Sequence, residues 1–260
     1  MYELNGVALD NAAKGWILQK GTRPYTGTSR AVESLRVPGR DGVVAGLSLD
    51  RDPVVVPIRV GMVPASVREF MALVDAAHTL SKASESVSTA VEVVSAEPEY
   101  PYAEPWVEVA LILRIPSGVW RSDTETTSSA VSIGSASVGV AVLSGLSVPV
   151  QDAIVRVKGS ITGLRVTDSS GSWFEYPPNI PSTSYLRFHS DTGEAYVTTS
   201  DTWTGGTDVS GVIDFNGPRG RFEITPSFTD PAVRVGGLTV TSSARSGASV
   251  QVRGRAAYHV

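Results

Sequence analysis

Apolar and polar residues alternate along much of the chain, which is the pattern of half-buried β-strands. The clearest example is residues 107–115, where Val, Val, Leu, Leu and Ile occupy every second position. A β-branched run at residues 54–60 predicts another strand, and Pro57 restricts it to a sheet edge or a bulge because proline has no backbone N–H. The N-terminal half is therefore expected to be rich in strands.

One segment follows a helical spacing instead. Apolar residues at positions 67, 70, 71, 74 and 77 fall three or four residues apart. Ser66 and Glu69 form an S-x-x-E pattern at the start of this series, which predicts a capping box. We expect the only clear helix at about residues 66–80, with His78 near its end, and we assign neither helix nor strand to residues 81–95.

The C-terminal half contains short alternating segments separated by glycine-containing turns. This density of strands favours a β-sandwich or a barrel. Strands are predicted at residues 154–158, 164–167, 186–189, 195–198, 209–215, 222–225, 232–235, 238–241 and 250–253.

A polar stretch marks the expected domain boundary. Residues 122–129, Ser-Asp-Thr-Glu-Thr-Thr-Ser-Ser, contain no apolar side chain. The predicted organisation is an N-terminal domain at residues 1–121, a linker at 122–129 and a C-terminal domain at 130–260. Charged residues make up only 18% of the chain, and 25 Gly and 16 Pro accompany many small polar residues, so the protein is expected to be mainly β.

Charge and cysteine content exclude several classes of function. A formal net charge of -4 offers no field that would attract a phosphate backbone, so we expect no nucleic-acid recognition. The absence of Cys excludes disulfides, thiolate metal sites and a cysteine nucleophile. No stretch approaches the roughly 20 apolar residues of a membrane span, and the N-terminus lacks the pattern of a signal peptide. We therefore expect no membrane insertion, and synthesis in a cytosol.

Catalytic motifs are missing from the sequence. Only three His residues are present, and the motifs of zinc proteases, serine hydrolases, P-loop proteins and dinucleotide-binding folds do not occur. Glu97, Glu99 and Glu104 lie among prolines and aromatic residues, where solvated charges are a better interpretation than a glycosidase pair. We expect no enzymatic activity, no cofactor and no metal site.

Aromatic residues of the C-terminal half suggest one binding chemistry. Trp173 and Trp203 could stack on sugar rings while Glu175 binds hydroxyl groups. Aromatic residues at a sandwich core or a subunit contact have the same appearance in sequence. We favour the structural interpretation and keep the sugar contact as the alternative.

Residues 35–43, Leu-Arg-Val-Pro-Gly-Arg-Asp-Gly-Val, predict a tight turn or hairpin tip, because proline fixes one φ and Asp-Gly supplies positive-φ geometry. This run resembles the Pro-Gly-Arg-Asp-Gly signature near the start of distal tail proteins of long-tailed, non-contractile bacteriophages. The end of the chain, Gly-Gly-Leu-Thr-Val-Thr at residues 236–241 with residues 250–258, is similar to the closing hairpin of their C-terminal sandwich. One departure is that Leu238 and Thr239 follow Gly237, where relatives often carry an Asn.

The resemblance implies a fold and a structural role. The fold would be an N-terminal β-rich belt domain with one α-helix, followed by a C-terminal galectin-like β-sandwich. The protein would be a virion component at the distal end of the phage tail, forming a homohexameric ring between the tail-tube protein and the tail-tip hub protein. Our candidate ring contact or lumen element is the turn formed by Pro38, Gly39, Arg40, Asp41 and Gly42.

Two other functions fit the same sequence. One is a carbohydrate-binding module that recognises sugar of the host cell wall, although the H-x-N-P-R ligand motif of galectins is absent, because Ser190-Asp191-Thr192 follows His189. The other is a different tail structural protein, such as a tail-tube subunit.

Overall fold

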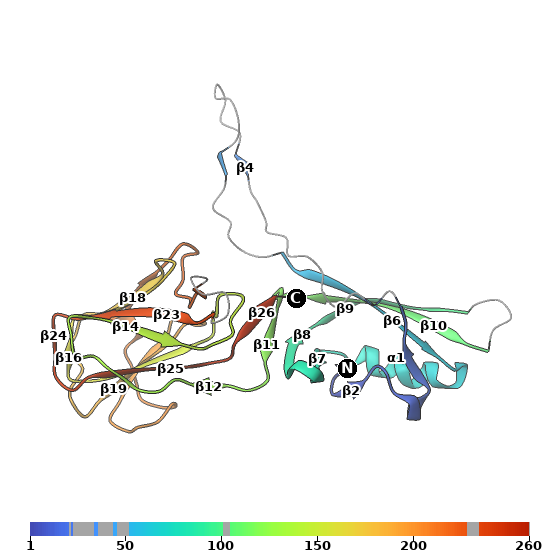
Figure 1. The fold of residues 1–260 in the computed structure, drawn as a ribbon, viewed down its shortest axis with the longest axis horizontal. Helices are drawn as coiled ribbons and strands as arrows, with labels where there is room; N and C mark the ends of the chain where they lie inside the picture. The colour runs from blue at the N-terminus through green and yellow to red at the C-terminus, as the bar shows by residue number, and fades with distance from the viewer. Residues whose placement is uncertain are drawn as a thin grey trace. The chain divides into compact units, whose positions relative to one another are not determined.

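The computed structural model describes residues 1–20, 22, 52–100, 105–227 and 234–259, and the backbone of residues 34–35 and 44–45. The chain divides into two compact units. The first contains Met1–Asp123 and Tyr258–Val260, and the second contains Thr124–Ala257. In the described residues the protein is mainly β with one α-helix, as the composition and the alternation predict (Figure 1).

A four-stranded antiparallel sheet forms the centre of the first unit. Its order is β3 (Trp16–Leu18), β6 (Val54–Met62), β10 (Val107–Ile115) and β9 (Glu92–Glu99). The alternation predicted for β10 is confirmed, since every second side chain from Val107 to Ile115 is buried. Strand β3 pairs only with residues 60–62 of β6. Pro57 lies outside this paired segment, so its missing N–H costs no hydrogen bond to β3.

A six-stranded sheet completes the first unit. Its order is β2 (Val7–Ala8), β1 (Tyr2–Leu4), β7 (Thr79–Lys82), β8 (Val87–Ala90), β11 (Val119–Ser122) and β26 (Ala257–His259). Residues 81–95, which the sequence leaves unassigned, thus form parts of β7, β8 and β9, with a short 3-10 turn at Ala83–Glu85. The last strand of the chain belongs to this sheet.

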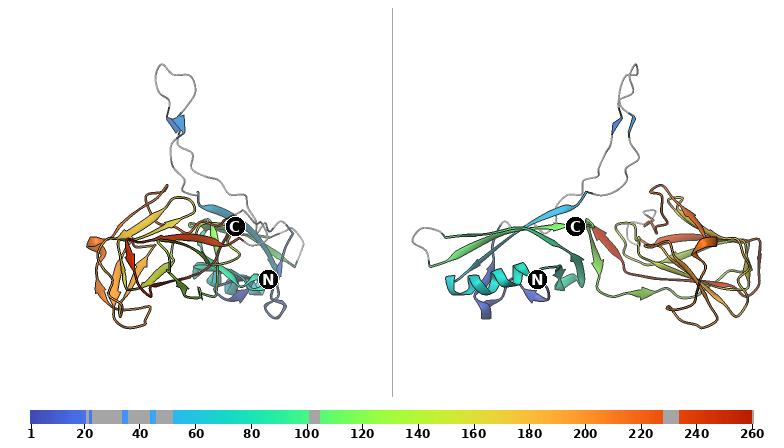
Figure 2. Two further views of the ribbon diagram at one scale, coloured as in Figure 1. Left: turned by 60° about the vertical axis from the view of Figure 1, so that its left-hand side comes forward. Right: turned by 180° about the vertical axis from the view of Figure 1, so that it is seen from behind.

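Helix α1 (Val67–Asp75) is shorter than predicted and follows a 3-10 turn at Pro64–Ser66. It lies along one face of the four-stranded sheet (Figure 2), where Phe70 and Val74 are buried. The expected capping box is wrong. The Ser66 hydroxyl donates to the carbonyl oxygen of Lys14 at 2.8 Å, and the Glu69 carboxylate pairs with the Lys14 ammonium.

The helix also ends earlier than its apolar spacing suggests. Ala76 is its C-terminal cap, so His78 lies beyond the helix, and β7 begins at Thr79. The side chain of Asn5 accepts hydrogen bonds from the backbone N–H groups of His78 and Thr79, both at 3.1 Å. These contacts from the N-terminal hairpin hold residues 78–79 in an extended conformation.

The second unit contains two larger sheets. The seven-stranded sheet has the order β12 (Thr126–Thr127), β25 (Ser249–Gly254), β15 (Ile154–Lys158), β19 (Tyr185–His189), β20 (Ala195–Thr198) and β21 (Thr207–Asp208), and β13 (Val131–Ser132) also pairs with β25. The five-stranded sheet has the order β14 (Ser137–Val142), β23 (Gly236–Thr241), β17 (Leu164–Asp168), β18 (Trp173–Tyr176) and β22 (Asp214–Asn216).

These two sheets share an aromatic core. Phe174 of β18 stacks on Phe188 of β19 with 4.3 Å between ring centroids, and Phe222 meets both rings edge-on. Because Phe174 and Phe188 come from different sheets, the sheets face each other across these rings. The arrangement is the two-layered β-structure that the strand density predicts.

The predicted strands of this unit are only partly confirmed. Residues 209–215 contain a 3-10 turn at Ser210–Val212 before β22, and residues 222–225 contribute only an isolated bridge between Ile224 and Val150. The segment 232–235 falls partly outside the described residues. The sequence does not predict strands β14 and β18. Glycine and serine residues interrupt the apolar alternation of β14, and consecutive aromatic residues hide that of β18.

Residues 122–129, predicted to be a linker, make backbone hydrogen bonds over much of their length. Ser122 ends β11, and Thr126 and Thr127 lie opposite Gly254 and Arg253 of β25. The N–H of Ser128 donates to the carbonyl oxygen of Val252 at 2.8 Å. A stretch without apolar side chains can therefore still be ordered through its backbone.

Candidate functional site

The predicted ring contact cannot be placed. Pro38, Gly39, Arg40, Asp41 and Gly42 lie outside the described residues. The nearest described segments are β4 (Ser34–Leu35) and β5 (Val44–Ala45), which pair antiparallel with Leu35 opposite Val44. The motif follows β4 and precedes β5 in the sequence, and its contact role stays a prediction.

The two tryptophans of the predicted sugar contact belong to different sheets. Trp173 lies on β18 of the five-stranded sheet, with Glu175 two residues further along the same strand. The Arg165 guanidinium lies 4.0 Å from the centroid of the Trp173 ring and forms an ion pair with Glu175 at 3.0 Å. Arg165 thus occupies one face of the Trp173 ring and one carboxylate oxygen of Glu175.

Trp203 lies in the loop between β20 and β21 of the seven-stranded sheet. The Arg156 guanidinium is 4.3 Å from the Trp203 ring centroid, and Asp201 from the same loop pairs with Arg156 Nη1 at 2.5 Å. Within the described residues, Trp203 makes no ring contact, ion pair or hydrogen bond with Trp173 or Glu175. The structure therefore does not bring the three predicted sugar contacts together.

Polar side chains form a row across the seven-stranded sheet. Gln251, Arg156, Arg187 and Tyr196 occupy directly opposed positions on four neighbouring strands. Strand alternation places Leu186 and Phe188 on the other side of the sheet, where both are fully buried. The row thus lies on the face of the sheet that points away from the aromatic core.

The loop that carries Trp203 borders an open cavity of about 220 Å³ on this face. Its lining residues are Arg187, His189, Tyr196, Trp203, Thr204 and Gly205. Burial lowers the pKa of His189, and the charge of Arg187 acts in the same direction, while Asp191 and Glu194 oppose the shift. The alternation of β19 predicts a solvent-facing Arg187, so the sequence does not indicate this cavity.

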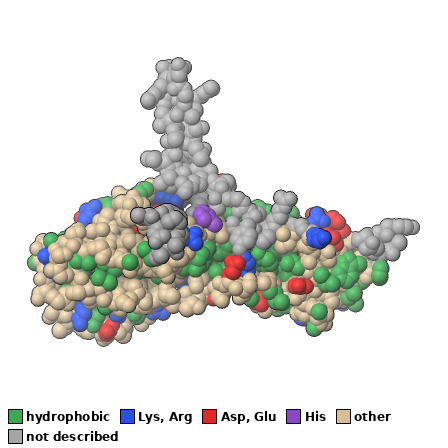
Figure 3. Space-filling view, in the orientation of Figure 1, with side chains coloured by type: hydrophobic (Ala, Val, Ile, Leu, Met, Phe, Trp, Pro, Cys, Tyr) green, Lys and Arg blue, Asp and Glu red, His purple; other side chains and the backbone are tan. Residues whose placement is uncertain are grey.

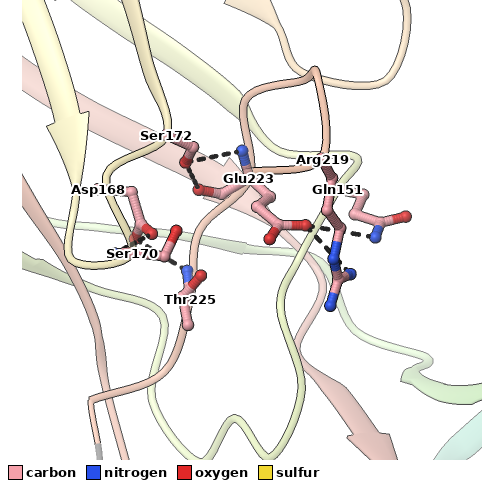
Figure 4. Close-up of polar contacts among 7 residues, drawn as sticks. All are labelled: Gln151, Asp168, Ser170, Ser172, Arg219, Glu223 and Thr225. Carbon is pink, nitrogen blue, oxygen red and sulfur yellow. Dashed lines mark hydrogen bonds and ion pairs between the residues drawn. The ribbon is translucent and has the colours of Figure 1, made fainter. Parts of the chain in front are cut away.

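A second set of polar groups serves a structural purpose. Asp168 Oδ1 accepts from the N–H of Thr225 and Asp168 Oδ2 from the N–H of Ser170, each at 2.9 Å (Figure 4). The Ser172 hydroxyl donates to the carbonyl oxygen of Glu223 at 2.8 Å, and the Glu223 carboxylate pairs with Arg219 at 3.3 Å. The Asp168 carboxylate and the Ser172 hydroxyl thus connect the end of β17 and the loop after it to residues 223–225. The Glu223 carboxylate pairs with Arg219 inside the second segment.

The glutamates that the sequence analysis considers as a glycosidase pair do not form a common site in the described residues. Glu97 and Glu99 are exposed on β9, and Glu104 lies outside the described residues. Figure 3 shows charged side chains scattered over the visible face. In the described part of the chain, no three His, Asp or Glu residues are grouped to hold a metal ion. No described helix is long and apolar enough to cross a membrane.

A comparison with solved structures finds proteins of similar fold. The crystal structure of the SPP1 Dit protein, described as a paradigm of the hub adsorption apparatus in phages that infect Gram-positive bacteria, matches with a TM-score of 0.60 at 11% identity. The match covers 98% of this chain and 98% of that chain. No protein-family model and no curated protein matches the sequence.

Two chains from structures of the phage P2 baseplate in its activated conformation also match. Their TM-scores are 0.35 and 0.34 at 11% and 12% identity, and they cover 92% and 93% of this chain and 90% and 91% of those chains. The match to SPP1 Dit confirms at the level of fold what the sequence resemblance predicts: the chain has the fold of a phage distal tail protein along nearly its whole length.

Proposed function

We propose that this protein is a structural component of the phage tail tip, located in the virion at the distal end of the tail. The observation that carries the proposal is the match to SPP1 Dit over 98% of both chains, which therefore extends over both compact units of this chain. Fold alone does not determine function. The sequence resemblance at residues 35–43 and 236–258 is the second, independent support.

In this role the first unit forms a closed ring of six copies, docked on the tail-tube protein and on the tail-tip hub protein. The second unit is the galectin-like sandwich of the family. Ring closure requires a head-to-tail contact whose rotation divides a full turn, because other angles generate open filaments. The proposal therefore predicts a discrete particle.

Strand β9 is the candidate for part of this contact. It is the last strand of its sheet, and no described strand pairs with its outer edge. Its side chains are largely exposed, and they include Val93 and Val94. An eight-residue edge strand that carries exposed apolar side chains is a ready template for pairing with another chain.

The test is electron microscopy and light scattering of the purified chain, alone and with its tail-tube neighbour. We expect closed sixfold particles. Strictly monomeric protein under both conditions, or open filaments of this chain alone, would contradict the assignment, and stacked open tubes would identify a tail-tube subunit instead.

A pair of matched variants tests the contribution of β9. Val94 is 58% exposed on β9, and Val212 is 51% exposed in the second unit. We expect Val94→Lys to shift the equilibrium toward monomers, because it places a charge on the pairing edge, while Val212→Lys leaves the rings intact. Equal effects of the two variants would exclude β9 from the contact.

A further inference from the structure

Arg187 is a buried cation in the second unit. Its side chain extends from β19 on the polar face of the seven-stranded sheet, yet the residue is only 1% exposed. The loop between β20 and β21 covers it, since a Cβ atom at Gly206 would lie 3.4 Å from an Arg187 Nη atom. Its Nε atom is buried and has no hydrogen-bond partner among the described residues.

In the described part of the chain, no ion pair compensates the charge of Arg187. Arg156 lies directly opposite on β15, and like charges in a cross-strand pair repel. Arg156 itself has partners, because Asp201 forms an ion pair with it and the Gln251 amide oxygen accepts a hydrogen bond from it. Among the described residues, the Arg187 guanidinium contacts only the ring of Tyr196, whose centroid lies 5.8 Å from the guanidinium carbon.

Glu194 and Asp208, the carboxylates whose charges act on Tyr196, form no ion pair with Arg187. Glu194 accepts a hydrogen bond from the Tyr196 hydroxyl at 3.1 Å, and Asp208 accepts from the Ser210 hydroxyl at 2.6 Å. Burial and the charge of Arg156 accordingly lower the pKa of Arg187. A buried guanidinium is normally paired, so this arrangement lacks an anion.

The cavity beside Arg187 is large enough to hold a small anion. It measures about 220 Å³, whereas a water molecule occupies about 30 Å³ of the liquid. The Nε2 atom of His189, a second lining residue, is likewise buried without a partner among the described residues. Thr204 adds a hydroxyl group, and Tyr196 and Trp203 form aromatic walls.

We propose that this cavity binds a small oxyanion, a carboxylate or a phosphate group, held by Arg187. The planar guanidinium matches both groups through two parallel hydrogen bonds. The anion reaches the site either as a free ion or as a substituent of a sugar, for which the aromatic walls leave room. This binding is independent of ring formation, which we assign to the first unit.

The experiment is isothermal titration calorimetry of the full chain in phosphate-free buffer at constant ionic strength. The probes are inorganic phosphate, glucose 1-phosphate, glucuronate and uncharged glucose. We expect the charged probes to bind and glucose not to bind. Glucose 1-phosphate at least about tenfold tighter than phosphate supports a sugar-borne anion, and equal affinities support a free ion. Absence of binding by all three charged probes at millimolar concentration would overturn the proposal.

Variants assign the binding to Arg187. We expect Arg187→Met to abolish binding while the ligand-free protein keeps or gains thermal stability, because an uncompensated buried charge is removed. Arg187→Lys keeps the charge but loses the planar fork, and should weaken binding at least about tenfold. Arg165→Met, on the other sheet, is the matched control and should bind as the parent protein does. Unchanged affinity in both Arg187 variants would refute the site.

Discussion

The ion pair between Glu223 and Arg219 shows how burial changes the value of a contact at the scale of single residues. Their side chains are 4% and 8% exposed, whereas those of Glu175 and Arg165 are 33% and 42% exposed. Solvent screens the pair between Glu175 and Arg165, but it scarcely reaches the pair between Glu223 and Arg219. The same principle distinguishes Arg156, which has a carboxylate partner, from Arg187, which has none in the described structure.

We predict that Glu223→Ala destabilises the protein by about 3–5 kcal/mol, because it leaves Arg219 buried without its counter-charge. Glu175→Ala, which removes the exposed pair, should cost less than about 1 kcal/mol. Urea denaturation of both variants provides the comparison. Similar costs for the two substitutions would show that burial does not control the strength of the Glu223 contact.

At the scale of elements, β6 illustrates how closely strands and side chains pack in the first unit. A Cβ atom at Gly61 would lie 2.4 Å from both Gln19 Nε2 and Trp106 Nε1. The absence of a side chain at this position therefore lets the indole of Trp106 lie directly against the strand. Gly139 on β14 is the opposite case, because a Cβ atom there would meet nothing within 4 Å.

We expect Gly61→Ala to destabilise the protein by about 1–3 kcal/mol, the usual cost of overpacking a core. Gly139→Ala should be neutral or slightly stabilising, since it restricts the unfolded chain without a clash. Thermal unfolding of the two alanine variants measures the difference. A neutral Gly61→Ala would mean that Gln19 and Trp106 move aside without cost.

At the scale of the whole molecule, the division into two units differs from the predicted boundaries at both ends of the second unit. Thr124 rather than Ala130 begins the unit, and its last residue is Ala257. The three residues that follow belong to the first unit, where β26 joins the sheet of β11. Backbone pairing of β12 with β25 explains the earlier start.

We predict that a fragment of residues 124–257 unfolds cooperatively on its own, as an independent domain. A fragment of residues 130–257 should fold with a lower midpoint, because β25 loses the backbone pairs that Thr126 and Thr127 supply. Thermal denaturation followed by circular dichroism compares the fragments. A molten or insoluble product from the longer fragment would refute the independence of the second unit.

The local alternation of apolar residues is enough to predict β10, β15 and β20, and the three-and-four-residue spacing after Ser66 predicts the one helix. The alternation works because a strand turns successive side chains to opposite faces, whatever lies beyond it. The resemblance at residues 35–43 and 236–258 similarly predicted the distal-tail fold. Both signals depend on neighbouring residues in the sequence.

Tertiary structure alone decided which groups meet. Lys14 contacts both Ser66 and Glu69, the two residues of the expected capping box. Asn5 accepts a hydrogen bond from His78 and keeps the chain extended where the apolar spacing predicts more helix. Arg187 has the strand position of an exposed residue and is buried only because the loop containing Trp203 folds over it. Such contacts join residues distant in sequence, and their energies depend on burial, which periodicity along a strand does not encode.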